Sequence, residues 1–448
     1  MLNGKVYIIY SPGLISAAMR NKDISFDPFV LEFAESVVGL SKRQVELVGA
    51  PDAIDRVVTL MHAALASTSL SKMVGNGLLE VKAVLNSVDA GPALHIPDIS
   101  IWLGDAMAQA AMRGLYGRNS PLNGEALQDL WSAHSHDQPA SQFIDQESRD
   151  FDQNFSMLVL GVAPDLVAPK AVQARRRLHA RLSKFYQGHL DKGDDVSALI
   201  QNRALLHREF GFTDAELGVT EFSIPWAATT NTPLSLIWLF TSVFSRSDLV
   251  ERIRPEVEAI TVVTAAQTGK TATMDVNKFD KHCPTLMACY REALRLYNDN
   301  TGNRKVVRDT VIQDADGREY LLKKGTAVQW IAGVTHLDES IWGEDARSFN
   351  PDRWIQATAQ DEKRRRPAHI PFGGGRNLCP GRKFALAEQL ALVGAVALGF
   401  EVEGVQVPRI VKTPLGNATR PASWEGLDPS VKIWRRTGWE DVTWDFIC

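Results

Sequence analysis

The sequence contains little cysteine, with four residues in 448, at Cys283, Cys289, Cys379 and Cys448. No two of them form a Cys-x-x-Cys pair and no secretory signal peptide precedes them, so a disulfide framework is not expected. Structural zinc is not expected either, because it needs closely paired Cys or His ligands and only His282 and Cys283 are adjacent. The one thiol that remains of interest is Cys379, because its flanking residues are unusual.

The sequence also lacks an excess of charge and a long hydrophobic run. Lys and Arg number 49 and Asp and Glu number 53, a net charge of −4, so no global field favours nucleic acid. The most apolar long stretch, 224–244, is interrupted by Ser, Thr and Asn side chains, which argues against a bilayer span. Binding to a polyanion or a membrane would therefore have to be local.

The remaining composition is that of an ordinary globular protein, with 45% apolar and 23% charged side chains. Dividing the length by about 150 residues gives a first expectation of roughly three domains. No internal repeat, low-complexity tract or flexible linker divides the chain, however, and this weakens that expectation.

Local patterns predict several elements. A capping box at Thr213 and Glu216 begins a long helix that we expect to reach about Arg246, bent by Pro225 and Pro233. The other predicted helices are 97–116, 284–297 and 381–398, and the predicted strands are 6–10, 305–313, 320–322 and 327–331, with an irregular stretch at 336–354.

The most informative segment begins at Phe372 and reads Phe-Gly-Gly-Gly-Arg-Asn-Leu-Cys-Pro-Gly-Arg. Three successive glycines let a backbone approach a flat ligand where any β-carbon would collide. Cys379 precedes a helix predicted to start near Gly381, and a helix N-terminus stabilises a thiolate over a thiol. Such a sulfur suits the axial position of haem iron, where it favours O–O cleavage. The simpler alternative is a buried free cysteine. A phosphate-binding loop does not fit, because no Gly-Lys-Ser/Thr ending follows the glycines.

This segment resembles the haem-ligating loop of the cytochrome P450 family, and two further motifs follow the same resemblance. Glu292 and Arg295 are similar to the family's Glu-x-x-Arg pair, which taken alone is an ordinary i,i+3 ion pair. Arg353, in Phe-Asn-Pro-Asp-Arg-Trp, resembles the arginine that completes a buried triad with that pair. Two arginines sharing one buried glutamate must have all their donors paired, so we expect a structural lock rather than a chemical role.

The resemblance implies one mainly α-helical domain over residues 1–448, with a small β region and a buried haem b. Cys379 would be the axial iron ligand, and Arg304 and His369 are candidates for the haem propionates, each also readable as a solvated side chain. The other residues that the resemblance assigns to cofactor binding are Phe372, Gly373, Gly375, Arg376 and Gly381.

The central helix of the family carries a glycine, an acid and a threonine beside the oxygen pocket. Here Thr232 matches the threonine, Asn231 stands in place of the acid, and Thr229 replaces the glycine. This pattern is similar to the branch that contains sterol 7α-hydroxylases and prostacyclin synthase. Asn231 orients water but exchanges no proton near neutral pH, so Thr232 or ordered water would carry the relay. The alternative is that these side chains only bond back to helix carbonyls.

The resemblance implies a monooxygenase that inserts one oxygen atom of O2 into a lipophilic small molecule, such as a terpenoid, steroid or polyketide of secondary metabolism. Two alternatives remain open: an isomerase or dehydratase that rearranges a peroxide without a reductase, and a haem sensor that turns nothing over. Retention of Thr232 favours oxygen activation. The pocket would be roofed by the central helix and by 61–73 and 155–166, with Trp226 and Leu236 as lining candidates that are more simply read as core.

The implied partner is an NADPH-dependent cytochrome P450 reductase, with cytochrome b5 as a second candidate. The basic run 363–366 precedes Cys379 by about a dozen residues and could receive an acidic partner, or be an ordinary solvated loop. The sequence resembles eukaryotic members of the family, of the fungal type. Such members carry an N-terminal membrane helix and a first helix that this sequence does not show. We therefore expect the endoplasmic reticulum membrane if an anchor was truncated, and the cytoplasm otherwise.

Overall fold

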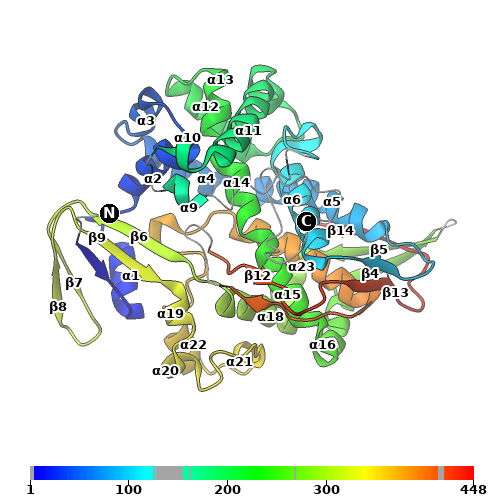
Figure 1. The fold of residues 1–448 in the computed structure, drawn as a ribbon. Helices are drawn as coiled ribbons and strands as arrows, with labels where there is room; N and C mark the ends of the chain where they lie inside the picture. Colours follow the sequence, from blue (N-terminus) through cyan, green and yellow to red (C-terminus); the bar gives the residue numbers. More distant parts are fainter. Residues whose placement is uncertain are drawn as a thin grey trace.

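The computed structural model of the chain describes residues 5–124, 127, 155–159, 161, 163–266, 269–411 and 418–448. Its centre is a group of helices that contact one another: α5 (Ser67–Asn86), α6 (Ile99–Tyr116), α15 (Thr232–Phe244), α16 (Ser247–Glu258), α18 (Pro284–Leu296) and α23 (Arg382–Gly399). Figure 1 shows them grouped beside the four-stranded sheet of β1, β2, β6 and β9.

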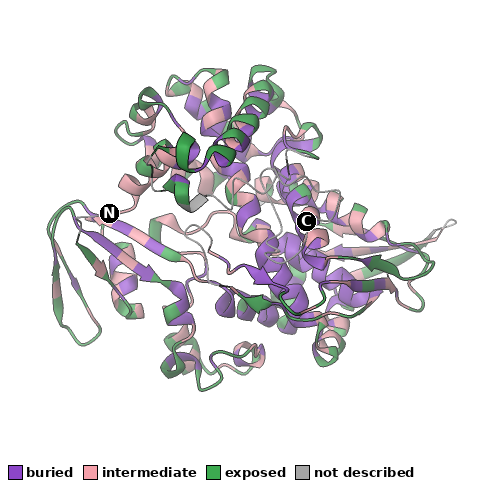
Figure 2. Ribbon diagram, viewed as in Figure 1, coloured by how far each residue is buried: buried purple, intermediate pink, exposed green. Residues whose placement is uncertain are grey.

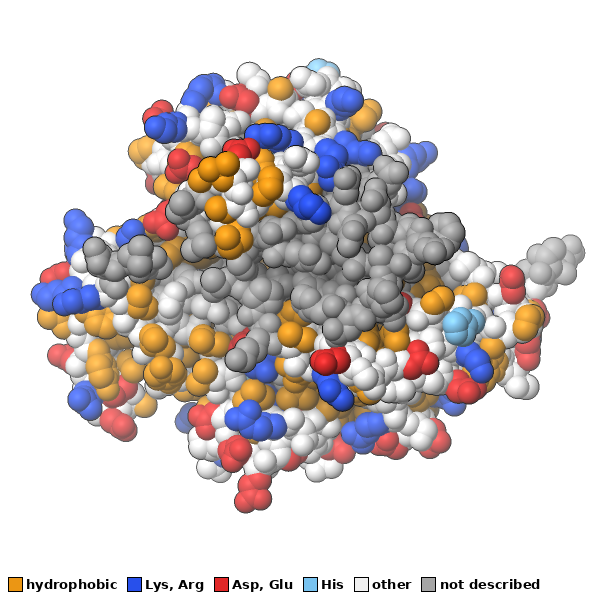
Figure 3. Space-filling model, in the orientation of Figure 1, with side chains coloured by type: hydrophobic (Ala, Val, Ile, Leu, Met, Phe, Trp, Pro, Cys, Tyr) orange, Lys and Arg blue, Asp and Glu red, His pale blue; other side chains and the backbone are white. Residues whose placement is uncertain are grey.

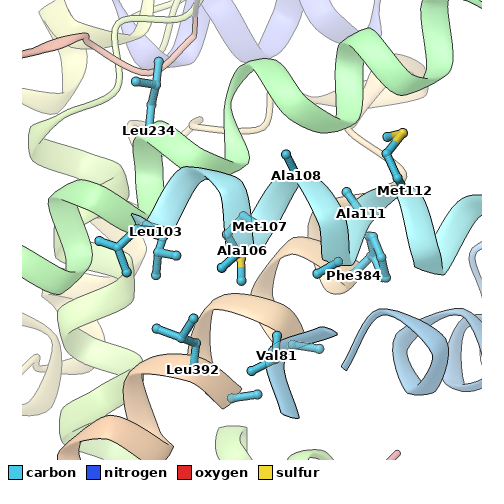
Figure 4. Packing of buried hydrophobic residues seen from close by; sticks show 14 of the residues in the cluster. Val81, Leu103, Ala106, Met107, Ala108, Ala111, Met112, Leu234, Phe384 and Leu392 are labelled. Carbon is cyan, nitrogen blue, oxygen red and sulfur yellow. The ribbon is translucent and has the colours of Figure 1, made fainter. Parts of the chain in front are cut away.

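Two of the central helices, α15 and α23, are buried on every face over long runs of mostly apolar residues. In α23 every residue from Ala387 to Gly399 is buried, and in α15 the buried run extends from Pro233 to Val243 (Figure 2). A helix that is apolar all round needs partners on all sides. Figure 4 shows part of this packing, with Met107 of α6 lying between Leu392 of α23 and Val81 of α5.

Further helices surround this centre, with α11 to α13 above it and α19 to α22 below it in Figure 1. Their bounds are α1 (Pro12–Arg20), α2 (Asp27–Phe33), a π-helix η1 (Ala34–Val38), α3 (Lys42–Val48), α4 (Ala53–Ala64), η2 (Gly117–Asn119), α9 (Phe155–Val159), α10 (Pro164–Val167), α11 (Pro169–Gln187), η3 (Leu190–Lys192), α12 (Ala198–Glu209), α13 (Asp214–Thr220), α14 (Ser223–Thr230), η4 (Val276–Lys278), α17 (Phe279–His282), α19 (Ala332–His336), α20 (Glu339–Trp342), α21 (Asp352–Ile355), α22 (Ala359–Arg365) and η5 (Gly375–Asn377).

The strands join distant parts of the chain in small sheets. The four-stranded sheet has the order β1 (Val6–Ile8), β9 (Ala327–Ile331), β6 (Thr301–Val306), β2 (Ile24–Ser25), and only the β1–β9 pair in it is parallel. The other sheets are β10 (Phe400–Glu403), β13 (Val431–Arg435), β3 (Leu94–Ile96); β14 (Val442–Ile447), β5 (Gly269–Asp275), β4 (Thr261–Ala266); β11 (Arg409–Ile410), β12 (Ala422–Ser423); and β7 (Thr310–Gln313), β8 (Glu319–Leu322). The parallel β1–β9 pair places the beginning of the chain beside residues 327–329.

Exposed apolar side chains gather on the lobe that carries β1 and the β7–β8 hairpin (Figure 3). They include Ile8, Tyr10, Val311 and Leu321. The hairpin alternates, so that its other face buries Ile312 and Leu322. The hairpin therefore covers a small core on one side only.

Most predicted elements agree with the structure, and three do not. The stretch 336–354 was expected to be irregular but contains α20 and the beginning of α21. The expected helix 213–246 is three helices, α13, α14 and α15, because the helical path is interrupted at Glu221 and again at Asn231, two residues before Pro233. The expected strand 305–313 is also wrong, because β6 ends at Val306 and β7 begins only at Thr310.

Within the described ranges, no single helix is both long and apolar enough to cross a membrane. The pair of α4 and residues 68–86 satisfies that test only when the two are counted together, and the two are bent by 69°.

Candidate functional site

Cys379 lies in a tight loop between η5 and α23. Its backbone N–H donates to the carbonyl of Phe372 at 3.0 Å, and Gly373 N–H donates to the carbonyl of Ile370 at 3.1 Å. Gly373 and Gly375 have φ angles of +69° and +63°, a region that other residues rarely adopt. The loop therefore needs glycine at these two positions for its own backbone path.

Helix α1 packs directly against the same loop and gives a second reason for the glycines. A Cβ on Gly375 would lie 2.5 Å from the carbonyl oxygen of Met19, and one on Gly374 would lie 2.6 Å from the Met19 sulfur. Approach of a ligand was the expected reason for these glycines. The structure adds that they admit a neighbouring helix.

The Cys379 thiol lies beside the start of α23. Burial raises its pKa, while hydrogen bonds from the backbone N–H groups of Gly381 and Arg382 at the start of α23 act to lower it. A cation at the sulfur would complete the stabilisation of the thiolate. In the described part of the chain no three His, Cys, Asp or Glu side chains gather as a metal site. One thiolate alone fits a metal whose other ligands come from a macrocycle, as in haem.

Glu292 is the centre of a buried polar cluster. Arg295 donates to both carboxylate oxygens at 2.8 and 2.7 Å, and Arg353 Nε donates to Oε1 at 2.9 Å. Trp354 Nε1 and the backbone N–H of Asn350 donate at 2.9 and 3.0 Å. The structure thus brings the three expected residues together and adds two donors that sequence reasoning missed, although both belong to the segment around Arg353.

The outer donors of the two arginines are also satisfied. Arg295 Nη1 donates to the carbonyls of His336 and Ala346, both at 2.6 Å, and Arg353 Nη1 donates to the carbonyl of Trp342 at 2.7 Å. Glu292 and Arg295 are fully buried and Arg353 nearly so. Because each charge has several partners, the cluster ties α18 to the segment that contains α19, α20 and α21.

The two propionate candidates, Arg304 and His369, lie in different surroundings. His369 packs against Trp354 and His336, with ring centroids 4.8 and 5.5 Å apart, and burial followed by nearby Arg291 lowers its pKa to about 3. The ring is therefore neutral and carries no charge for a carboxylate.

Arg304 is a buried cation with few partners. Its guanidinium lies over Phe26 and Trp330 at 4.9 and 5.1 Å, and its one hydrogen bond to a described residue goes to the carbonyl of Asn303 at 2.8 Å. Burial lowers its pKa to about 10, and the more distant charge of Asp27 only partly offsets this. A buried guanidinium with spare donors fits an anionic group such as a propionate.

Arg376 and Phe372 complete the predicted cofactor set. Arg376 pairs with Asp55 of α4 at 2.6 Å and with Asp27 of α2 at 3.4 Å, and its side chain is 42% exposed. Phe372 is half-buried against the main core. The structure therefore shows Arg376 joining the loop to two helices.

The central helix breaks at the residues expected to handle oxygen. The hydroxyls of Thr229 and Thr230 bond back to the carbonyls of Pro225 and Trp226 at 2.8 and 2.7 Å. The Thr232 hydroxyl donates no hydrogen bond to a described residue and is partly exposed. The carbonyl-bonding alternative thus holds for Thr229 and Thr230 but not for Thr232.

Asn231 reaches across to another segment. Its side-chain oxygen accepts from the backbone N–H groups of Ala418 and Thr419 at 2.9 and 3.0 Å. No local pattern predicted these bonds, since 187 and 188 residues separate the partners.

The residues proposed to roof or line the pocket are only partly informative. Trp226 packs on Phe33 at 5.4 Å and Leu236 is fully buried in the main core, in keeping with the core reading of both. Residues 160 and 162 of the predicted roof 155–166 lie outside the described residues, and Leu166 in the same segment is 82% exposed.

The basic run 363–366 lies at the end of α22 and is only partly free. Arg364 pairs with Asp361 at 2.8 Å, and Arg365 donates to the carbonyl of Arg353 at 2.5 Å. Lys363 and Arg366 are exposed. These two cations thus carry most of the accessible charge of the run.

Comparison with known proteins agrees with this geometry. A cytochrome P450 family model matches residues 5–425. A cytochrome P450 monooxygenase of Gibberella zeae is 32% identical, with alignment over 100% of this chain and 83% of that protein. Cytochrome P450 monooxygenase nodJ of Hypoxylon pulicicidum is 27% identical over 99% of this chain and 83% of its own. A 5-beta-cholestane-3-alpha,7-alpha-diol 12-alpha-hydroxylase of Sus scrofa is 25% identical over 81% and 74%.

The fold is similar to that of a retinoic acid-bound cyanobacterial CYP120A1. The two share 18% identity with a TM-score of 0.69, over 97% of this chain and 90% of that one. At this identity the likeness shows the fold alone, which is mainly helical with small sheets. The family match and the fungal relative support a haem protein that uses O2 and an electron donor. The chain therefore belongs to the cytochrome P450 family and is an oxidoreductase of the monooxygenase type.

Proposed function

We propose that this chain inserts one atom of O2 into a lipophilic small molecule, at a haem b held by Cys379. The observation that carries the proposal is the Cys379 thiol, which accepts from the N–H groups of Gly381 and Arg382 in a place where no three His, Cys, Asp or Glu side chains gather among the described residues. When bound, the haem supplies the oxygen-activating chemistry, and the thiolate enriches its iron in electron density. Residues 1–448 act in this proposal as one domain.

The chain's own residues then bind the haem and deliver protons. Arg304 holds a propionate through its spare donors, whereas neutral His369 packs in the aromatic cluster beside Trp354. Thr232 passes protons through its hydroxyl. This hydroxyl donates to no carbonyl among the described residues, whereas those of Thr229 and Thr230 donate to carbonyls of their own helix. Ordered water supplies the protons that Asn231 cannot.

The substrate in this proposal is a lipophilic ring system of the steroid or terpenoid kind. Two mammalian relatives carry names of sterol-type 12-alpha-hydroxylases, and the two fungal relatives described above are named monooxygenases.

Electrons come in this proposal from an NADPH-dependent reductase at the endoplasmic reticulum, docked near Lys363 and Arg366, with cytochrome b5 as a second donor. Opposite charge raises the association rate and makes it sensitive to salt. Charge reversal at both positions should lower the reductase on-rate and flatten its salt dependence. Unchanged turnover at low ionic strength would refute this docking surface.

The haem assignment is tested by the absorbance of the reduced protein with carbon monoxide. Wild type should show the red-shifted band of a thiolate-bound iron, and Cys379→His should lose it while still binding haem. A folded, haem-loaded wild type without that band would overturn the proposal. Reductase-dependent O2 uptake and product formation then separate a monooxygenase from a peroxide isomerase and from a sensor.

A further inference from the structure

Residues 418–420 form a short extended segment, called here the strap, which is held from two sides. On one side Asn231 accepts from the N–H groups of Ala418 and Thr419, and Trp238 Nε1 donates to the carbonyl of Arg420 at 2.7 Å. Both side chains belong to the central helix region, at the start and middle of α15. The central helix thus binds three consecutive residues of the strap.

The other side of the strap is held by the residues that follow α18. The N–H of Asp299 donates to the carbonyl of Ala418 at 2.7 Å, and the N–H of Arg420 donates to the carbonyl of Tyr297 at 2.8 Å. Thr419 also forms a β-bridge with Asn298. The strap is therefore clamped between α15 and the end of the helix that carries Glu292 and Arg295.

The strap is bonded to the residue next to Thr232, the proposed proton-relay residue. Asn231, which accepts from the strap, immediately precedes Thr232 in the chain. Asn298, the bridge partner of the strap, donates to the carbonyl of Pro371 at 3.3 Å, directly before the loop of Cys379. The strap is thus bonded to the residue before Thr232 and, through Asn298, to the residue before Phe372 in the cysteine loop.

We propose that Asn231 is a positioning residue that holds the strap as a wall of the substrate pocket, and so affects which ligands fit beside Thr232. This inference rests on the proposed function. The hydrogen bonds support a positioning role, because the Asn231 side-chain oxygen accepts from two backbone N–H groups of the strap. Without Asn231, the N–H groups of Ala418 and Thr419 lose the only acceptor that the described residues offer them.

This role predicts which substitutions are tolerated. An aspartate at 231 retains an oxygen in the same place and accepts both N–H groups through charge-assisted bonds, whereas an alanine accepts neither. A proton-relay role predicts the opposite: Asn231→Asp would have the larger effect and Asn231→Ala the smaller, because aspartate adds an acid where asparagine has none. Asn231→Asp and Asn231→Ala therefore distinguish positioning from proton transfer.

The first experiment measures amide hydrogen exchange of residues 418–420, which requires neither turnover nor substrate. Asn231→Ala should exchange the Ala418 and Thr419 amides about tenfold faster than wild type, and Asn231→Asp should keep them protected. Thr230→Val is the matched control, because its hydroxyl bonds only to the carbonyl of Trp226 in its own helix. Equal protection in Asn231→Ala and wild type would overturn the proposal, as would loss of protection in both Asn231 variants.

The second experiment measures the shape of the pocket with haem-binding azoles of different size. Asn231→Ala should change the Kd for 4-phenylimidazole by about fivefold while leaving that for imidazole within about twofold, because only the larger probe reaches the pocket wall. Asn231→Asp should match wild type for both probes. Parallel changes for both azoles, or no change for either, would overturn the wall role.

The two proposals fail separately. A missing thiolate band with carbon monoxide would refute the haem assignment and leave the exchange result unaffected. If Asn231→Ala does not fold, Trp238→Phe offers a second variant, because it removes the indole hydrogen bond to the carbonyl of Arg420 while keeping an aromatic ring stacked on Tyr297, which lies 4.0 Å away. Wild-type exchange of the Ala418, Thr419 and Arg420 amides in that variant would then refute the clamp.

Discussion

The polar groups of the Glu292 cluster are fully hydrogen-bonded, whereas those of the proposed ligand side, Arg304 and Thr232, are not fully hydrogen-bonded within the described part of the chain. Glu292 receives hydrogen bonds from four residues, and the arginines that reach it continue to backbone carbonyls. On the ligand side, Arg304 has one hydrogen bond among the described residues and the Thr232 hydroxyl donates none. Complete pairing indicates a structural lock, whereas donors without a partner among the described residues indicate room for a ligand or water.

The most severe way to break this comparison is Glu292→Gln. It leaves the buried guanidiniums of Arg295 and Arg353 without a counter-charge, which should cost about 3–5 kcal/mol and lose haem and fold together. Thermal unfolding and haem content measure the effect. The matched control is Arg291→Gln, one residue away, whose side chain is 46% exposed and pairs with Asp280 only at 3.5 Å. Equal stability of the two variants would contradict the lock.

On the ligand side, Thr232→Val should leave the fold intact and lower product formation by about 10²-fold, because it removes the relay hydroxyl at nearly constant shape. NADPH should still be consumed, and its electrons should reduce O2 to hydrogen peroxide. Product, peroxide and cofactor consumption are measured together. Thr230→Val is again the control, and an equal loss in both variants would assign the effect to packing.

A smaller effect is expected from Arg304→Gln, which removes the charge but keeps a donor. Haem should dissociate about tenfold faster, in line with the loss of one charge-assisted hydrogen bond, while circular dichroism stays unchanged. Transfer of haem to apomyoglobin gives the rate. Arg308→Gln is the control, since Arg308 is 77% exposed. A misfolded Arg304→Gln protein would place this arginine with the lock instead.

The comparison is sharpened by a second buried carboxyl, Glu388 of α23. It is fully buried, its Oε1 has no hydrogen-bond partner among the described residues, and burial raises its pKa well above the usual value. Gly77 of α5 packs so closely that a Cβ there would lie 2.8 Å from this oxygen. A group without partners inside a helical core is thus held protonated, not held for a ligand.

Glu388→Gln should therefore stabilise the protein in a pH-dependent way. The folded state retains a proton that the unfolded chain releases above about pH 4.3, so the free energy of unfolding falls as pH rises above that value. Glutamine removes this penalty. The variant should melt a few degrees higher than wild type at pH 8 and about equally at pH 4. A shift independent of pH would contradict the protonated state.

Much of the fold and the main site followed from local patterns. The capping box at Thr213, the helix that carries Glu292 and Arg295, and the loop before α23 are where the sequence indicated. The break before Pro233 was expected only as a bend, because the missing N–H of a proline shows that a helix is disturbed but not how far the two parts diverge.

The choice between Arg304 and His369 could not be made from sequence. Both are basic side chains that the resemblance offered for the propionates, His369 ten residues before Cys379 and Arg304 nine residues after Arg295. The structure separates them, because His369 is surrounded by aromatic rings and arginines that keep it neutral, whereas Arg304 remains a cation with spare donors. Burial and neighbouring charge decide this, and neither is a property of the local sequence.

What the sequence by itself determined was the family, the candidate sulfur ligand and the two arginines that pair with Glu292, because each is marked by residue types at short, fixed spacing. What only the tertiary structure decided was which residues far apart in the chain meet and which buried groups have no partner. Asn231 with Ala418 and Thr419, Met19 against Gly375, and Glu388 without a hydrogen-bond partner among the described residues are the examples. The physical reason is that hydrogen bonds and burial depend on distance in space, which a local pattern does not contain.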